Sequence, residues 1–564
     1  MVVKKVLYLF SFIFCYHNCI AQNTFFNEIH LMDYQRTKQL LNDSNEVVTN
    51  SFLIRSTSSY QFLQSKLKGT SKDIIQFVNY NFDQQNNSLL PISINDGNMY
   101  PAKGWQERYS YGVNLKLLIF DINYQPEKLT VQNLMQEPYY GNKNDGNFMF
   151  KYFGMVANSI DNFRQFGYDR IEETTLGQSR AGIRTKYIAA GVSNENIWWG
   201  PGKRNSLVFT NNAAGFKHYY LKTVEPIKTY IGSFELAGVV GKLDTTKYTE
   251  IDQELLNICR PCKVFKNIDE REIDGITINY QPKWIPNFYI GYAYSRQFYR
   301  HATDALGDTV NFFSKNLPKQ EIGSMFFRFA MPEDHAEFYG EMGMPDETPW
   351  PWKFFKSNVR PAYIFGATKL VPLNFWNSYL YLNVEFAQTQ IMDPRKYFYK
   401  GFANVGGQPT SWYQSTIVQQ GYSNNGQLMG SYIGPGSNNQ SISLSWNKGF
   451  NKIGIFVERT AYNNDFYSVA YMNPYNGGYI PSFGTYVYGY YNRYWVDLTQ
   501  RLELQLMPLK NILLSASFSN TQALNYRWIR IEDGSKYDEP SSLTDKFNQQ
   551  FQMSIKYLLH AVVK

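Results

Sequence analysis

Most of the chain alternates between apolar and polar residues in short segments, the pattern of β-strands whose two faces meet different surroundings. In the segment 380–388, LYLNVEFAQ, four apolar residues fall on one face, while Asn383 and Glu385 fall on the other. The segments 442–446 and 551–557 alternate in the same way. The polar face is too hydrophilic for a sealed core and suits a watery lumen.

The alternation is sustained only from about Trp105 onward. The segment 24–42 has a helix-compatible pattern, and the residues that follow it up to roughly 100 are mixed and rich in Gln, Asn and Ser. We therefore predict a partly helical, periplasmic region over 22–100 and a barrel over 101–564.

Short turns and long loops alternate between the predicted strands. Tight turns are expected at 285–287 and 508–511, whereas 402–440 and 461–490 are long stretches rich in Gly, Asn and Tyr. This asymmetry is typical of outer-membrane barrels, whose long loops face outward. At about 25 residues for each strand and its loop, the sequence predicts an all-β, antiparallel transmembrane barrel of roughly 16–20 strands.

The composition supports a wall with one apolar and one wet face. The 564 residues include 45 Tyr and 41 Phe, yet the mean hydropathy is −0.42. Tyr and Trp are favoured where a membrane meets water. The net charge of +8 is mild for this length and is not clustered, which argues against a nucleic-acid partner.

The N-terminus has the organisation of a signal peptide. Lys4 and Lys5 precede the apolar run VLYLFSFIFCY, and small residues lead to a predicted cleavage site after Ala21. No later run of about 18 apolar residues occurs, so no transmembrane helix is expected. We predict an exported protein with residues 1–21 removed.

The segment 197–216, IWWGPGKRNSLVFTNNAAGF, combines adjacent tryptophans with a Gly-Pro-Gly turn. One interpretation is structural: Gly200, Pro201 and Gly202 form a tight turn that the tryptophans anchor. The other is a sugar platform, with indole stacking, amides that bind hydroxyls and an arginine that meets a carboxylate. The candidate sugar contacts are Trp198, Trp199, Arg204, Asn211 and Asn212.

The segment 421–441, GYSNNGQLMGSYIGPGSNNQS, is a second Gly- and Asn-rich stretch. It is either a surface loop or a loop folded into the barrel mouth, where Asn424 and Asn425 would offer amides to a polysaccharide.

The remaining reactive residues favour structure over catalysis. Cys259 and Cys262 are predicted to form a small loop disulfide, because export is oxidising and no second Cys pair suggests a metal site. Glu337, Glu341 and Asp346 could be read as catalytic carboxylates, but lumen ion pairs explain them better. The sequence contains no common catalytic or nucleotide-binding motif, so no enzyme activity, cofactor or metal is predicted.

The segment 197–216, the strand 238–244 and the segment 421–441 together resemble the capsule assembly Wzi family. The resemblance covers roughly 105–530 and implies an outer-membrane barrel of about 18 strands with a small periplasmic helical element. It also implies a lectin that holds capsular polysaccharide at the cell surface without catalysis. Residues 22–100 and the long loops depart from the family pattern.

We therefore predict an outer-membrane protein that binds a capsular or other surface polysaccharide. Its expected partners are this glycan, outer-membrane lipids and other envelope proteins. The alternatives are a scaffold for surface-protein secretion or gliding motility, a diffusion channel, or a glycan-cleaving enzyme.

Overall fold

A computed structural model describes twelve segments of the chain. They are 28–42, 51–56, 75–136, 152–248, 266–301, 317–345, 360–373, 375–391, 410–470, 494–509, 511–528 and 545–559. The predicted signal peptide, the Cys259–Cys262 pair and Asp346 lie outside these residues.

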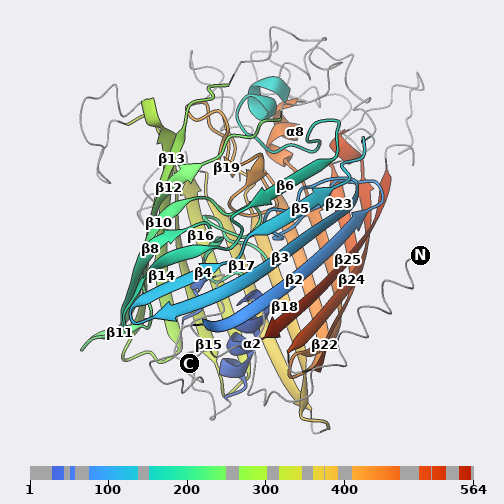
Figure 1. Ribbon diagram of the computed structural model, residues 1–564. Coiled ribbons are helices and arrows are strands. Elements are labelled where there is room, and N and C mark those ends of the chain that lie inside the picture. Colours follow the sequence, from blue (N-terminus) through green and yellow to red (C-terminus); the bar gives the residue numbers. More distant parts are fainter. Residues whose placement is uncertain are drawn as a thin grey trace.

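The described chain forms a closed antiparallel β-barrel of 18 strands, which confirms the predicted fold class (Figure 1). Its wall begins with β2 (Ile75–Asn87), β3 (Gly104–Leu117), β4 (Phe120–Tyr124), β5 (Glu127–Val131), β6 (Ile171–Thr175), β7 (Arg180–Arg184), β8 (Ile188–Ser193), β10 (His218–Thr223) and β11 (Ile227–Lys228). It continues with β12 (Gly232–Leu243), β13 (Arg271–Pro282), β14 (Phe288–Tyr299), β15 (Gln320–Met331), β16 (Ala336–Pro345), β17 (Ala362–Leu373), β18 (Ser378–Gln388), β21 (Asn438–Lys448), β22 (Asn451–Ala461), β23 (Val496–Leu509), β24 (Ile512–Leu524) and β25 (Lys546–Leu559).

Three of the 18 strands are broken into two labelled pieces each. β4 and β5 both pair with β3. On their other side β4 pairs with β7 and β5 with β6, and β10 and β11 both pair with β12. Pro126 and Pro226 occupy two of the breaks, because proline has no N–H to donate to a ladder. Gly177, with a φ of 53°, occupies the third.

The barrel closes through β2, which pairs with β25 on one side and β3 on the other. The predicted barrel boundary at residue 101 is therefore wrong by one strand. Asn81, Asp83, Gln85 and Asn87 face the lumen and Tyr80 is exposed on the outside, so β2 does alternate. The sequence of β2 does not show this apolar–polar alternation clearly, because polar residues also occupy outward positions near the end of the strand.

The outer surface is apolar. On β22, Ile453, Ile455 and Val457 point outward and each is at least half exposed, at 50–56%. Exposed aromatic residues gather at the short turns, where a girdle is expected: Tyr187, Tyr230, Trp284, Phe375 and Trp376. No helix among the described residues is long and apolar enough to cross a membrane.

The predicted faces of the segment 380–388 are those observed in β18. Leu380, Leu382 and Phe386 are exposed outside, whereas Asn383 and Glu385 are buried inside. The predicted turn at 285–287 joins β13 to β14, and the predicted N-terminal helix is α2 (Glu28–Leu40). α2 lies at the end of the barrel that carries the short turns, and α8 (Asn464–Ala470) at the opposite end (Figure 1).

Folded segments occupy the lumen and its long-loop end. They are α2, the short strand β1 (Ile54–Ser56), and the stretches 152–170, 194–217 and 410–437, of which 152–170 lies at the long-loop end (Figure 1). The last three carry the π-helix η1 (Phe153–Ala157), β9 (Ile197–Trp199), β19 (Ser423–Asn424) and β20 (Gln427–Leu428). Together these segments are called the plug below.

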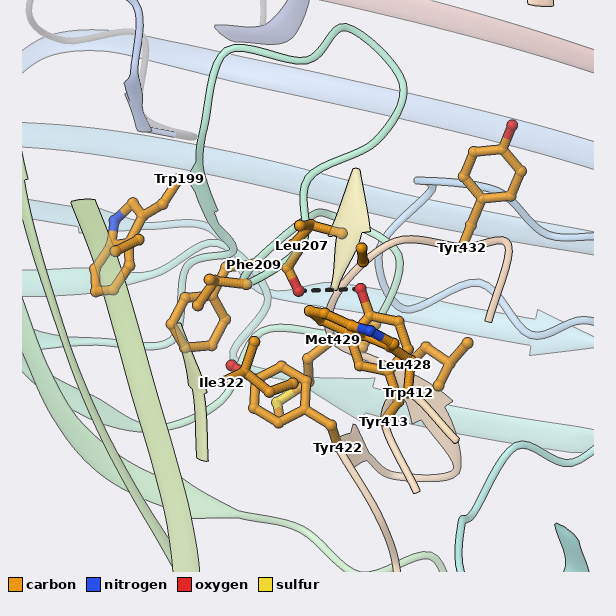
Figure 2. Close-up of a cluster of buried hydrophobic side chains, with 14 of the residues drawn as sticks. Trp199, Leu207, Phe209, Ile322, Trp412, Tyr413, Tyr422, Leu428, Met429 and Tyr432 are labelled. Carbon is orange, nitrogen blue, oxygen red and sulfur yellow. Dashed lines mark hydrogen bonds between the residues drawn. The ribbon is translucent and has the colours of Figure 1, made fainter. Parts of the chain in front are cut away.

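The plug has its own hydrophobic core, which packs against the inner wall. Figure 2 shows its centre, where the side chains of 194–217 meet those of 410–437. Tyr413 and Tyr422 stack at 5.9 Å, and the Tyr413 hydroxyl donates a 3.0 Å hydrogen bond to the Leu207 carbonyl. Wall residues such as Ile273 and Ile322 complete the core. A lumen expected to be watery is thus largely filled by packed protein.

Candidate functional site

The two adjacent tryptophans form β9, which pairs with β1 inside the lumen. Trp199 is 1% exposed and packs edge-on against Phe209 at 5.0 Å. Gly275 of the wall makes room for it, because a Cβ there would lie 3.1 Å from the indole ring. Trp198 is also buried, and the Arg55 guanidinium lies 4.9 Å from its ring centroid. Both tryptophans therefore hold the plug together.

The Gly-Pro-Gly turn is the point at which α2 and β1 attach to the plug. The Pro201 carbonyl accepts hydrogen bonds from Arg36 of α2 at 2.8 Å and from Arg55 at 3.3 Å. The Gly202 carbonyl accepts a second bond from Arg55 at 2.6 Å. Gly200 has a φ of 132°, which disfavours residues with a Cβ.

The basic pair after the turn binds carboxylates of the plug and wall. Lys203 Nζ lies 3.0 Å from Asp33 of α2. Arg204 lies 3.1 Å from Glu458 of β22, and its guanidinium stacks 4.2 Å from the Phe456 ring centroid. The predicted sugar contact Arg204 is thus engaged within the protein.

The four predicted asparagines take part in hydrogen bonds within the plug or between the plug and the segment 88–103. Asn212 donates to the Leu428 carbonyl at 3.1 Å, Asn424 to the Ala214 carbonyl at 3.0 Å, and Asn425 to the Tyr100 hydroxyl at 3.0 Å. The backbone carbonyl of Asn211 accepts a 2.8 Å bond from the N–H of Gly97, while its buried side-chain Oδ1 has no partner among the described residues. The structure brings 421–441 into the lumen beside 197–216, as one of the two interpretations of that segment proposed.

The carboxylates of β16 take part in buried polar networks. Glu337 accepts bonds from Arg36 at 2.9 Å and from Arg328 at 2.7 Å, and all three side chains are at most 1% exposed. Glu341 accepts the backbone N–H of Leu207 at 3.1 Å. Neither residue faces the other across an open cleft. Among the described residues, no group of His, Cys, Asp and Glu is arranged to hold a metal ion.

A polar chamber of about 560 Å³ remains between the plug, α2 and the wall. Trp198, Arg204 and Asn211 border it, together with Arg55 and Lys203. Three of the predicted sugar contacts thus line the chamber, and Trp199 packs in the plug core away from it.

A smaller cleft of about 130 Å³ lies at the long-loop end of the barrel, and the predicted sugar contact Asn212 is among its lining residues. It is called the mouth cleft here, and its lining includes Arg164, Tyr432, Tyr462, Trp495 and Trp528. These residues come from four separate stretches. The available sequence signal was the Tyr and Trp residues next to long loops, at Tyr462, Trp495 and in the 3₁₀ turn η6 (Tyr526–Trp528).

Residues 122–269 match the family model described as the capsule assembly protein Wzi. The match contains the Trp-Trp-Gly-Pro-Gly turn and ends before the segment 421–441. The resemblance to the Wzi family is thereby confirmed. No curated protein sequence matches the chain.

The Escherichia coli Wzi structure has the same barrel fold. It is described as an outer-membrane, carbohydrate-binding β-barrel involved in group 1 capsule assembly. The TM-score is 0.55 at 11% identity, with 96% of this chain and 100% of the Wzi chain covered. Pseudomonas aeruginosa OpdQ has a TM-score of 0.38 at 7% identity, covering 86% of this chain and 97% of that one. Acinetobacter baumannii OccAB2 has a TM-score of 0.38 at 10% identity, covering 86% and 98%.

Proposed function

We propose that this chain is a non-enzymatic outer-membrane protein that binds a surface polysaccharide and retains it on the cell. The observation that carries the proposal is the plugged lumen together with an aromatic cleft at the long-loop end of the described barrel. Stacking rings combined with a few polar groups are the usual composition of small-molecule and sugar sites. The Wzi match over 122–269 supports the same class of ligand.

The plug argues against the alternative of a diffusion channel. Trp199, Leu207, Phe209, Trp412 and Tyr413 are buried in one packed core across the lumen. Packed interiors leave few voids larger than a water molecule. We therefore expect the purified protein to show no stable, porin-like conductance in planar bilayers. Step-like openings in the wild type would support the channel alternative instead.

The positions of the carboxylates support a binding role over glycan cleavage. A glycosidase needs two carboxyl groups that face one substrate at a defined separation. Glu337 is held by two arginines and Glu341 by the plug backbone. Incubation with a surface polysaccharide should therefore release no new reducing ends.

The decisive experiment compares wild-type cells with a strain that lacks the protein. Surface polysaccharide is measured separately on washed cells and in the medium. We expect polysaccharide to move from cells to medium while the total stays level, and the complemented strain to reverse this. Unchanged fractions would contradict retention and favour the scaffold for secretion or gliding motility.

A further inference from the structure

The mouth cleft contains an arginine whose guanidinium N–H groups have no hydrogen-bond acceptor among the residues that the structure describes. Arg164 lines the cleft, and its guanidinium carbon lies 5.3 Å from the Trp495 ring centroid and 5.7 Å from that of Tyr462. Within the described part of the chain, its side chain forms no hydrogen bond and no ion pair within 4.0 Å, although the Asp497 carboxylate lies near enough to attract it electrostatically. Because stacking uses the flat face of a guanidinium, its N–H groups remain available at the edge.

A rigid aromatic cluster fixes this arginine. Trp495 packs against Tyr462 at 4.6 Å and against Trp528 at 5.3 Å. The Trp495 indole N–H donates a 2.8 Å hydrogen bond to Asp497, which sets the orientation of the ring. Trp495 and Trp528 are each only 5% exposed, so the cluster is packed as a core is. The cluster therefore presents Arg164 in a defined position.

The backbone beside the cleft is strained in the way that binding sites often are. Arg527 and Trp528 are consecutive non-glycine residues with φ values of 57° and 55°, and Asn525 has a φ of 49°. Each non-glycine residue in this region costs on the order of 1–3 kcal/mol and persists only where its surroundings hold it. Both Arg527 and Trp528 line the cleft. The strain places a second arginine and an indole at one site.

We propose that the mouth cleft binds a carboxylate-bearing sugar residue of the polysaccharide, with Arg164 as the carboxylate ligand. The inference rests on the proposed function and adds the substrate class. A guanidinium edge matches a carboxylate in geometry, and a charge-assisted bond is stronger than a neutral one. The ring faces of the cleft, including Tyr432 and Tyr152, supply apolar contact for the sugar ring. A neutral sugar would gain the apolar contact with the rings but would lack the charge-assisted bond to Arg164.

The test uses the purified full chain in detergent and two matched probes. One is a glucuronic-acid oligosaccharide, and the other is the same oligosaccharide after chemical reduction of its carboxyl groups. Binding is followed by calorimetry. We expect the acidic probe to bind about tenfold or more tightly than its reduced form, as charged hydrogen bonds imply. Arg164→Gln should reduce that preference to within about threefold.

Arg459→Gln is the matched control. Arg459 is exposed on β22 and hydrogen-bonded to Asn438 and Gln440 at 2.9 Å, away from the residues of the cleft. The control should keep the full preference. Heat-modifiable migration on gels verifies that each variant is folded.

Three outcomes would overturn the inference: equal binding of both probes by the wild type, no binding of either, or an unchanged preference in Arg164→Gln. The cell assay distinguishes these from failure of the proposed function. If deletion releases polysaccharide while the Arg164→Gln strain retains it, retention stands and the acidic-sugar site is wrong.

Discussion

The backbone N–H of Lys203 in the plug donates a 2.6 Å hydrogen bond to the carboxylate of Glu385 on the barrel wall. The next two N–H groups of the turn, those of Arg204 and Asn205, point at the same carboxylate at 3.2 and 2.9 Å. The Tyr339 hydroxyl adds a fourth donor at 2.8 Å. One buried carboxylate of the wall thus accepts hydrogen bonds from the backbone that follows the Trp-Trp-Gly-Pro-Gly turn.

Replacing Glu385 by Gln should loosen the plug. The amide would turn an NH₂ group toward donors that need an acceptor, and several buried N–H groups would lose a charged partner. We expect the free energy of unfolding to fall by about 2–4 kcal/mol, measured by denaturant titration of the folded barrel. Glu172→Gln is the control, because Glu172 is 57% exposed and pairs with the exposed Arg170. Equal losses in both variants would contradict the role of Glu385.

The triad of Arg36, Glu337 and Arg328 predicts an asymmetry between two substitutions. Glu337→Gln leaves two buried guanidinium groups without a carboxylate, whereas Arg36→Met leaves Glu337 still paired with Arg328. Breaking a buried network by removing the shared partner costs about 3–5 kcal/mol. We expect Glu337→Gln to be the more destabilising of the two, again by denaturant titration. If Arg36→Met were the more destabilising, the other contacts that Arg36 makes from α2 would contribute more to the free energy of unfolding than its ion pair with Glu337.

The wall was predictable because the bilayer imposes a strict alternation on each strand. In β18 that alternation placed Leu382 outside and Glu385 inside, as the sequence predicted. The failure at β2 has a physical cause. Gln84, which hydrogen-bonds Glu107 of β3, and Asn86 lie between the inward residues Asp83, Gln85 and Asn87, so polar residues follow one another and the period of two disappears.

The interior was less predictable because the plug depends on contacts between distant segments. Asn212 and Leu428 are hydrogen-bonded although 216 positions separate them. Nothing local in 197–216 distinguishes an indole that packs on Gly275 from one that stacks on sugar. The mouth cleft was missed for the same reason, since Arg164, Tyr462 and Trp495 meet only in the folded barrel.

The turn at Gly200 should tolerate no side chain. A Cβ there would lie 2.7 Å from Ser206 Oγ and 2.8 Å from Glu341 Oε2, and the φ of 132° is unfavourable for alanine. We expect Gly200→Ala to lower the free energy of unfolding by at least about 2 kcal/mol. Gly238→Ala on β12 is the matched control, because its nearest neighbour, the Gly275 carbonyl, is 3.8 Å away. A neutral Gly200→Ala would mean that the turn can relax.

Lys203 predicts how the stability of the plug changes with pH. Burial lowers the pKa of Lys203 to about 8, with the nearby charge of Arg36 acting in the same direction and Asp33 opposing it. The unfolded side chain titrates near 10.5. Between these two pH values the unfolded chain binds more protons than the folded chain, so the contribution of Lys203 to the free energy of unfolding rises with pH.

The variant Lys203→Met isolates this contribution, because it keeps the backbone bond to Glu385 and removes only the titrating group. Between pH 8 and 10 the wild type should gain about 2 kcal/mol relative to Lys203→Met, measured by denaturant titration at each pH. Lys242→Met, at an exposed ion pair on β12, serves as the control for general effects of pH. If the wild type instead loses stability relative to Lys203→Met over this range, the ion pair with Asp33 outweighs the cost of burying the ammonium group.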